Sequence, residues 1–441
     1  MHIIEKSYKI LTGLILSVLF FSACGSKQKS DTATDTNIQK PYRVIVTSDI
    51  GGNDPDDFQS MVHLLLYADV LDIEGIIASP KGAGRVENIH EVINEYEKDY
   101  PSLVSYSEKY PTADSLRIIT KQGGVEVAGY KGYDDSSDGS EWIIQCARRD
   151  DPRPLYVLVW GGLEDVAQAL HDAPDILPKL RVHWIGGPNK KWGPDAYLYI
   201  AEHHPNLWII ESNATYRGWF TGGNQSGEWS NTGFTKKYIK DKGALGTFFM
   251  SQLGGKLKMG DTPSLAWLLK GDPENPSEPG WGGQFVRTWE RAYYHFTRMP
   301  DKTDSVQEFS ILEIVLPVGK NLPENPDALL QVENQLLKGH FLEDDSVRFR
   351  FCPKSDKYFS FKISSNVPVL DGVTGGITAL ITPSGFAKQP SEKYPNWWTD
   401  DPDPELAEGN RIGAKTVSKW RVDFLTDFAK KMERCQVVNN K

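Results

Sequence analysis

The sequence predicts an α/β protein: an open, mostly parallel sheet with helices on both faces, plus a small β-rich insertion. Short and almost continuously apolar runs alternate with helical patterns over the first 300 residues, as the buried strands and crossover helices of a parallel sheet do. Between residues 309 and 381, strand-like runs follow one another without helical patterns between them. We therefore expect an α/β domain over residues 42–300 and a β-rich insertion over residues 301–390.

The expected strands of the α/β domain each end in small or polar residues. The first, residues 43–48, runs into a glycine-containing acidic loop, and a helix follows whose apolar residues have the spacing i, i+3, i+4 and i+7: Phe58, Met61, Val62 and Leu65. The later strands are expected at residues 71–78, 155–160, 181–185 and 207–210. Ligands of open α/β sheets bind at the carboxyl ends of the strands, so the loops after these runs form the candidate site.

Strand-like runs dominate the insertion, at residues 309–318, 346–351, 358–363 and 376–381. Polar and apolar residues alternate over residues 347–351, which is typical of a half-exposed strand. Residues 391–441 are expected to form a loop rich in Pro and Trp, followed by a helix over residues 416–432. Trp420, Phe424 and Phe428 fall on one stripe of that helix, so we expect it to pack back on the α/β domain.

The first 24 residues are typical of an export signal. Lys6 and Lys9 precede an apolar run over residues 10–21, which is too short to span a bilayer comfortably, and small residues then lead to Cys24. A cysteine at this point resembles the bacterial lipobox, which implies an exported protein of the bacterial cell envelope, in the periplasm or at the outer membrane, anchored in the membrane by a lipid on Cys24. The alternative is an ordinary secretory signal. Residues 25–41 are polar and are expected to form a flexible tether.

The composition argues against several classes of protein. The 49 basic and 59 acidic residues give a net charge of −10, which disfavours a nucleic-acid partner and is compatible with a bound cation. After Cys24 only three cysteines follow, so at most one disulfide could form, and no cluster of His and Cys has the spacing of a zinc site. The sequence leaves the oligomeric state open, and a homo-oligomer is one alternative.

The loop after the first strand carries four carboxylates: Asp49, Asp54, Asp56 and Asp57. Crowded carboxylates repel one another, and a proton or a hard cation relieves the repulsion. The loop therefore predicts a Ca²⁺ or Mg²⁺ site with one carboxylate left for chemistry. In the alternative interpretation Asp54 and Asp56 only cap the following helix, which accounts for one aspartate but not for four.

Asp49, Asp56 and Asp57 resemble the opening motif of the nucleoside hydrolase superfamily, and more specifically of its nucleoside-hydrolase-like branch named after a cellulose-binding bacterial protein. Further segments resemble landmarks of the family or of that branch: residues 159–167, 259–264, 281–285 and 419–429. The resemblance implies an open α/β sheet, a single Ca²⁺ at the carboxyl ends of its strands, and hydrolysis of an N-glycosidic bond.

The resemblance also implies which residues would hold the ion. Matched by position, Asp49 would bind Ca²⁺ and take a proton from the attacking water, and Asp57 and Asp261 would be further carboxylate ligands. The backbone carbonyl of Glu164 would complete the shell. A Ca²⁺ ion in such a site can bind the sugar diol and the water together, which positions both and helps to deprotonate the water.

Five residues are expected to contact the substrate. By the same matching, Asp56 would accept a hydrogen bond from a sugar hydroxyl, and Asn189 and Asp195 would hold the rest of the sugar. Trp192 and Trp281 lie in glycine-rich loops near the expected site, where their rings could stack on a sugar. The expected ligand is a small nucleoside or saccharide.

Two departures from the family's pattern keep two functions open. Asp49 and Asp56 are seven positions apart where the family's usual motif has four, and Gly260 stands where a histidine often protonates the leaving base. The favoured hypothesis is an exported, lipid-anchored hydrolase that cleaves a glycosidic bond of a nucleoside- or ribosyl-like compound with a Ca²⁺-bound water. The alternative is a lipoprotein that binds cellulose or another plant-wall saccharide without turnover.

Overall fold

The computed structural model describes residues 41–52, 54–80, 84–291 and 293–436. The expected signal peptide, Cys24 and the tether up to residue 40 lie outside these ranges. Within the ranges, no helix is long and apolar enough to cross a membrane. Cys146, Cys352 and Cys435 are buried as free thiols.

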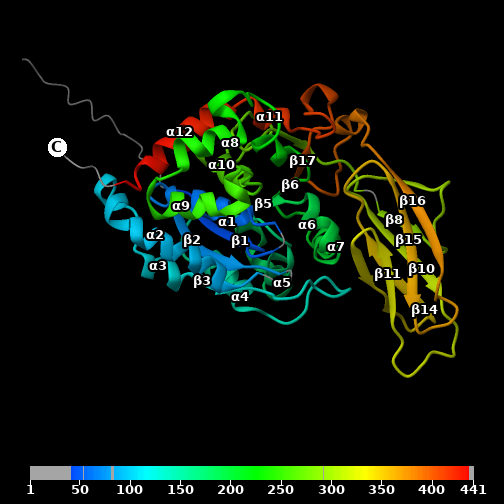
Figure 1. Ribbon diagram of the computed structural model, residues 1–441. Helices are drawn as coiled ribbons and strands as arrows, with labels where there is room; N and C mark the ends of the chain where they lie inside the picture. Colours follow the sequence, from blue (N-terminus) through cyan, green and yellow to red (C-terminus); the bar gives the residue numbers. More distant parts are fainter. Residues whose placement is uncertain (1–40, 53, 81–83, 292, 437–441) are drawn as a thin grey trace, which may run out of the picture. The chain divides into compact units, whose positions relative to one another are not determined.

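Eight strands form the main sheet, in the order β3-β2-β1-β4-β5-β6-β17-β7 (Figure 1). Their bounds are β1 Arg43–Ser48, β2 Asp72–Ala78, β3 Thr120–Gln122, β4 Leu155–Val159, β5 Leu180–Ile185, β6 Ile209–Ser212, β7 Phe285–Arg287 and β17 Trp397–Asp400. Neighbouring strands are parallel except β17 and β7, which are antiparallel. Strands β1 and β4 are buried along their whole length, as their apolar composition requires. The predicted fold class is confirmed.

Helices cover both faces of the main sheet (Figure 1). Successive residues of β1 point to opposite faces, so Val44 and Val46 belong to one hydrophobic core and Ile45 to another. The core with Val44 contains residues of α1 Asp56–Leu66, α2 Val86–Tyr106, α9 Gly243–Ser251, α10 Thr262–Leu269 and α12 Arg421–Glu433. The core with Ile45 contains residues of α4 Asp138–Ala147, α5 Glu164–Asp172 and α7 Pro194–His203. Shorter helices are α3 Ala113–Ile118, α6 Gly187–Trp192, α8 Asn231–Phe234 and α11 Lys415–Ser418.

A β-rich part, here called the β-module (residues 293–380), has two further sheets. One has the order β13-β14-β10-β8 and the other β12-β11-β15-β16-β9. Their strands are β8 Tyr293–Phe296, β9 Ser305–Gln307, β10 Ile311–Pro317, β11 Ala328–Val332, β12 Gln335–Lys338, β13 His340–Phe341, β14 Ser346–Phe351, β15 Tyr358–Ser365 and β16 Thr374–Leu380. Burial alternates along β15, and its buried residues share a third hydrophobic core with residues of β10 and β14.

The chain leaves the main sheet after β7, builds the β-module, and returns to the main sheet at β17. Residues 397–400 were expected to lie in a loop, but they form β17 and pair with both β6 and β7. Prolines close to both ends of this short stretch give it the sequence character of a loop, and its pairing with distant strands is a tertiary effect. Strand β8 begins before residue 301 and already belongs to a β-module sheet.

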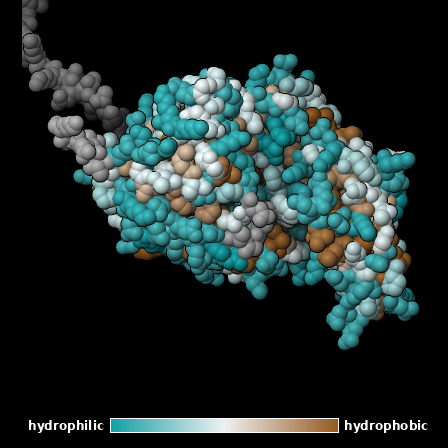
Figure 2. All heavy atoms as spheres, viewed as in Figure 1, coloured by the Kyte–Doolittle hydropathy of each residue, from teal (hydrophilic) through white to brown (hydrophobic). Residues whose placement is uncertain are grey.

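The C-terminal helix α12 packs on the α/β domain. Phe424 and Phe428 are buried in the core that contains α1, and the ring of Phe424 stacks on that of Trp219 with 3.6 Å between their centroids. In the view of Figure 2 the surface is mostly hydrophilic, and hydrophobic side chains gather over the β-module. Exposed apolar residues of that module include Tyr293, Leu336, Tyr358, Val369 and Leu380.

Candidate active site at the carboxyl end of the main sheet

An acidic cavity of about 350 Å³ lies where β1, β4 and β5 end. Three of its wall residues mark these ends: Asp49 follows β1, Trp160 follows β4 and Ile185 closes β5. The whole wall consists of Asp49, Gly52, Asp54, Asp56, Asp57, Trp160, Ile185, Pro188, Asn189, Trp192, Tyr216, Lys258, Gly260, Asp261, Asn334 and Lys354. The position agrees with the rule for open α/β sheets.

The turn after β1 fixes Asp49 and Asp57. Ser48, the last residue of β1, donates a 2.7 Å hydrogen bond from its Oγ to Oδ1 of Asp57, and the same Oγ accepts the N–H of Ile50 at 3.2 Å. Gly51 has a φ of +97°, a left-handed conformation that favours glycine. A Cβ atom at Gly161 would lie 3.1 Å from the Cβ of Asp49, so glycine lets the loop after β4 approach this aspartate closely.

Asp56 is held from two sides. Its Oδ2 accepts the N–H of Gly260 at 2.7 Å, and its Oδ1 lies 3.0 Å from Nζ of Lys258. Lys258 also pairs with Asp54, whose side chain is 60% exposed. Asp54 therefore lies toward solvent, as the longer spacing between Asp49 and Asp56 requires if Asp57 is to remain at the cavity.

Asp261 reaches the cavity through a strained loop that precedes α10. Met259 has a φ of +50°, which is unusual for a residue with a side chain, and it is fully buried. Asp261 is the N-cap residue of α10 and is also buried. Strain of this kind persists where the surrounding structure dictates it, and here it turns Asp261 toward the aspartates of the first loop.

The carboxylates of the cavity repel one another electrostatically. Burial, followed by the charges of Asp261, Asp49 and Asp56, raises the pKa of Asp57 well above its ordinary value. Burial and the charges of Asp56 and Asp49 do the same to the pKa of Asp261. Burial raises the pKa of Asp56 to about 6, although Lys258 opposes the shift. A proton or a hard cation would relieve this repulsion.

The donor chemistry of the cavity fits Ca²⁺, because its carboxylates supply hard, negatively charged oxygens. Among the described residues, however, no group of three or more His, Cys, Asp or Glu is arranged so that it could hold a metal ion. Asp49, Asp57 and Asp261 thus line the same cavity, and the charges of Asp49 and Asp261 raise the pKa of Asp57. They do not form a complete metal-coordination shell.

Glu164 does not line the cavity. It is the first residue of α5, so its carbonyl points along the helix, and burial raises the pKa of its side chain to about 8. Trp160 is the wall residue from this segment, and its carbonyl accepts a hydrogen bond from Nδ2 of Asn189 at 3.4 Å. The role of the Glu164 carbonyl as a ligand of the ion stays a prediction.

The expected substrate residues divide into two groups. Asp56, Asn189 and Trp192 line the acidic cavity, whereas Asp195 and Trp281 do not. Asp195 forms an ion pair of 2.6 Å with Arg350 of the β-module. Trp281 lies in a tight turn, and its backbone N–H donates to the carbonyl of Lys270 at 2.9 Å. Its side chain packs against the core that contains Val44.

Sequence reasoning missed four wall residues: Tyr216, Lys258, Asn334 and Lys354. Lys258 lies three residues before Asp261, and that proximity was the one available signal. Asn334 lies in a turn and Lys354 in a loop of the β-module, and no spacing in the sequence relates them to the acidic loop. The β-module therefore contributes to the wall of the cavity.

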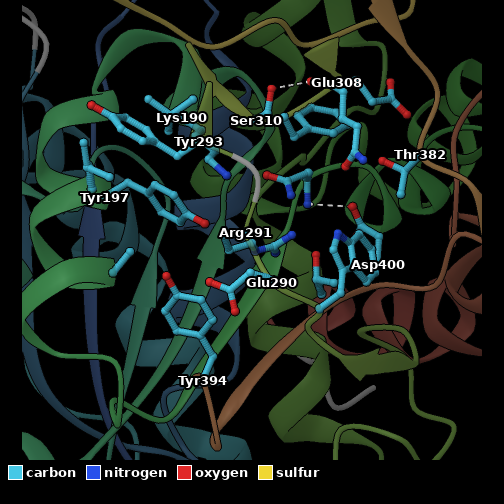
Figure 3. A pocket seen from close by; sticks show the side chains of 18 of the residues that line it. Lys190, Tyr197, Glu290, Arg291, Tyr293, Glu308, Ser310, Thr382, Tyr394 and Asp400 are labelled. Atoms are coloured by element: carbon cyan, nitrogen blue, oxygen red, sulfur yellow. Dashed lines mark hydrogen bonds between the residues drawn. The ribbon is translucent and has the colours of Figure 1, made fainter. Parts of the chain in front are cut away.

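A second, more enclosed cavity of about 180 Å³ shares no wall residue with the acidic cavity (Figure 3). Beside it the buried carboxylate of Glu211 accepts hydrogen bonds from Lys190 at 2.8 Å, Arg291 at 2.5 Å and Tyr197 at 3.1 Å. Burial acts to raise the pKa of Glu211, but Arg291 and Lys190 outweigh it and lower the pKa to about 2. This satisfied network joins β6 to α6, α7 and the segment that leads into the β-module.

The fold and the acidic cavity define the class: an α/β protein with a carboxylate-lined site at the carboxyl ends of its parallel strands. Residues 43–285 match the family described as cellulose-binding Sde182, nucleoside hydrolase-like domain. This match covers more than half of the chain, and the protein belongs to that family. None of the curated proteins matches the chain.

The chain is also similar in part to several solved structures. A nucleoside hydrolase-related protein from Saccharophagus degradans, associated with carbohydrate metabolism, is 20% identical over 78% of this chain and all of its own, with a TM-score of 0.48. An inosine-uridine preferring nucleoside hydrolase from Bacillus anthracis is 17% identical over 57% of this chain and 87% of its own, with a TM-score of 0.35. A purine-preferring ribonucleoside hydrolase from Gardnerella vaginalis is 12% identical over 56% and 83%, also with a TM-score of 0.35.

Proposed function

We propose that this protein hydrolyses a glycosidic bond in the acidic cavity, most simply the N-glycosidic bond of a nucleoside- or ribosyl-like compound. The observation that carries the proposal is the meeting of Asp49, Asp57 and Asp261, from two distant segments, on the wall of one cavity at the end of the main sheet. Three carboxylates in mutual repulsion have no structural benefit of their own, so a ligand or an ion is the natural reason for them.

The carboxylates of Asp49, Asp57 and Asp261 do not form a metal shell as they stand, and a single Ca²⁺ would draw them together around itself. When bound, such an ion supplies a positive charge that makes a coordinated water more acidic and binds sugar hydroxyls. Ser48 would keep one oxygen of Asp57 in place through its 2.7 Å hydrogen bond. Lys258 lowers the pKa of Asp261, but its positive charge also opposes a bound cation.

The chain's own residues would then divide the work. Asp49 takes the proton of the attacking water. Asp56, oriented by Gly260 and Lys258, accepts a hydrogen bond from a sugar hydroxyl. Asn189 and Trp192 form part of the wall around the space for the sugar. With glycine at position 260, either another wall residue protonates the leaving group or the group leaves as an anion. Lys258 and Lys354 are the cationic side chains of the wall.

Turnover of p-nitrophenyl riboside tests the proposal. We expect Asp49→Asn to lower kcat/KM at least about 100-fold, because it removes the base for the water. Asp135→Asn is the matched control, since Asp135 is exposed and does not line the cavity. If Asp49→Asn hydrolysed the riboside as fast as the control, Asp49 would have no catalytic role.

A second candidate function is saccharide binding without turnover. Gly260 offers no side chain for proton transfer, and one carboxylate oxygen of Asp56 is already paired with Lys258. This function predicts affinity for cello-oligosaccharides with no product over long incubation, and formation of product from any glycoside would exclude it.

We further propose that the chain is exported and anchored in the cell envelope through a lipid on Cys24. The support is the sequence alone: a short apolar run and small residues before that cysteine. Metabolic labelling with palmitate in an expressing bacterium should label the wild type and not Cys24→Ser, and equal labelling of both would refute the anchor.

A further inference from the structure

The acidic cavity has a cationic side. Lys354 lines this cavity and also a small neighbouring cavity of about 10 Å³, which Arg217 and Arg411 line with it. Tyr216, another wall residue of the acidic cavity, accepts a 3.1 Å hydrogen bond at its hydroxyl from Nε of Arg217. Three cationic side chains, here called the cationic cluster (Arg217, Lys354 and Arg411), therefore lie beside the carboxylate-lined site.

The cationic cluster comes from three distant segments. Arg217 belongs to the 3₁₀ helix η2 Thr215–Trp219, which follows β6. Lys354 lies in the loop between β14 and β15, and Arg411 lies in a tight turn in which it pairs with Glu408 through the backbone. All three cationic side chains are partly buried. The tertiary fold thus brings three positive charges together and removes part of their hydration, which has a free-energy cost.

The protein does not supply the cluster with acidic partners. Within the part of the chain that the structure describes, none of the three side chains forms an ion pair with a carboxylate. Burial lowers the pKa of Lys354, and the charges of Lys191 and Arg217 lower it further. Burial and the charge of Arg217 also lower the pKa of Arg411. A negative charge on a ligand would relieve this repulsion.

The nearby acids leave the cluster with a positive charge. Glu333 already pairs with Lys191 at 3.2 Å and with Lys357. Glu308 lines the small cavity, but burial, followed by the charge of Asp356, raises its pKa to about 7. At neutral pH Glu308 therefore carries only part of a negative charge. Asp356 also lines the small cavity, and it is exposed to solvent, where water screens its charge.

A phosphate group fits such a cluster. A phosphate monoester carries about two negative charges at pH 7 and three strong acceptor oxygens. A guanidinium group can donate two parallel hydrogen bonds to it, and an ammonium group adds a positive charge. A carboxylate would bring one charge and two oxygens to three cations. The number of cations therefore favours a phosphate over a carboxylate and over an uncharged group.

We infer that the ligand of the acidic cavity carries a phosphate group, which Arg217, Lys354 and Arg411 bind beside the ribosyl unit. The substrate class is then a phosphorylated riboside rather than a free nucleoside or a neutral saccharide. The inference rests on the proposed function for the place of the ribosyl unit, and its binding test does not require turnover.

Calorimetry on the full-length wild-type chain tests the inference, with ribose, ribose 5-phosphate and glucuronate as probes, each with and without CaCl₂. We expect ribose 5-phosphate to bind at least about tenfold more tightly than ribose, and the difference should shrink as NaCl is added. Equal affinity for the two would overturn the inference, and so would a difference that appears only with CaCl₂. Glucuronate bound as tightly as ribose 5-phosphate would overturn the assignment to phosphate.

Three variants locate the binding. Lys354→Met and Arg411→Met should each lower the ratio of the affinities for ribose 5-phosphate and ribose at least about threefold. Both variants should fold, because neither side chain has an ion-pair or hydrogen-bond partner in the described part of the chain. Lys362→Met is the matched control, since Lys362 is an exposed lysine of β15 that lines neither cavity. An unchanged ratio in both Lys354→Met and Arg411→Met would contradict the cluster as the phosphate site.

The outcomes separate this inference from the proposed function. If the wild type hydrolyses the nitrophenyl riboside but binds ribose and ribose 5-phosphate equally, the phosphate site is refuted and the hydrolase stands. If ribose 5-phosphate binds more tightly through the cluster and no glycoside is hydrolysed, the phosphate site stands and the hydrolase is refuted.

Discussion

The backbone N–H of Gly260 donates a 2.7 Å hydrogen bond to Oδ2 of Asp56, and a Cβ atom at position 260 would lie 2.6 Å from the same oxygen. Any residue with a side chain would therefore force Asp56 or the loop to move. Glycine at position 260 thus has a structural reason, because the position serves to hold Asp56.

Gly260→Ala should destabilise the protein by about 1–3 kcal/mol, the usual cost of overpacking. Thermal unfolding followed by circular dichroism measures this effect. Gly385→Ala is the control, because nothing lies within 4 Å of a Cβ atom there. Equal melting temperatures for the two variants would show that the contact with Asp56 is not tight.

Lys258→Met should strengthen Ca²⁺ binding by about threefold to tenfold at moderate salt, because a positive charge 3.0 Å from Asp56 repels the ion. Calorimetry with CaCl₂ measures the effect. Lys236→Met, at an exposed position outside the cavity, should leave the affinity unchanged. Weaker binding by Lys258→Met would mean that the lysine orients the carboxylates more than it repels the ion.

Asp195→Asn should lower the free energy of unfolding by about 1–3 kcal/mol, because Arg350 loses one of its two carboxylate partners and keeps only Glu313. Hydrolysis of nitrophenyl riboside should stay within about twofold of the wild type, since Asp195 does not line the acidic cavity. Urea unfolding and initial rates measure the two effects. A large loss of kcat/KM at unchanged stability would restore Asp195 as a residue that holds the sugar.

Acid should destabilise the protein through buried histidines. Burial lowers the pKa of His183 to about 3, and neither ring nitrogen has a hydrogen-bond partner within the described part of the chain. The unfolded chain takes up a proton near the ordinary pKa and the folded chain does not. The neutral His183 therefore adds its full contribution to the free energy of unfolding above about pH 6.5, and this contribution is lost as the pH falls toward 3. About 2 kcal/mol is lost between pH 7 and pH 5.

His183→Phe isolates this contribution. Its stability in urea should fall between pH 7 and pH 5 by about 2 kcal/mol less than that of the wild type. The ring of His183 already packs edge-on against Trp267 and Phe285, so a phenyl ring suits the position. His203→Phe, at an exposed site, should keep the wild-type dependence on pH, and an identical slope in His183→Phe would show that another group is responsible.

The sequence was informative wherever function follows from local pattern. The apolar run over residues 43–48 and the acidic loop after it predict a buried strand with its ligand edge, and the structure places Asp49, Asp56 and Asp57 there. Asp261 was found through the family resemblance, because its distance along the chain gives no hint of its distance in space. Its pKa and that of Asp57 are raised by shared neighbours.

Features that depend on tertiary contacts could not be predicted from the sequence. Asp195 was expected at the sugar, yet Arg350 from the β-module binds it, and no local pattern predicts that partner. Trp281 was chosen for its glycine-rich loop, which instead forms a tight turn against the core. Asn334 and Lys354 reach the cavity only because the β-module packs beside α6 and α7.

The central claim is that Asp49, Asp57 and Asp261 form one Ca²⁺ site, and calcium titration by calorimetry tests it most directly. The four proteins are the wild type, Asp49→Asn, Asp57→Asn and Asp261→Asn, each in buffer from which Ca²⁺ has been removed. We expect the wild type to bind one Ca²⁺ per chain and each variant to bind it at least about tenfold more weakly, because each loses one carboxylate of a shared site. If the wild type bound no Ca²⁺, or if all three variants bound it as tightly as the wild type, the three aspartates would not form a metal site.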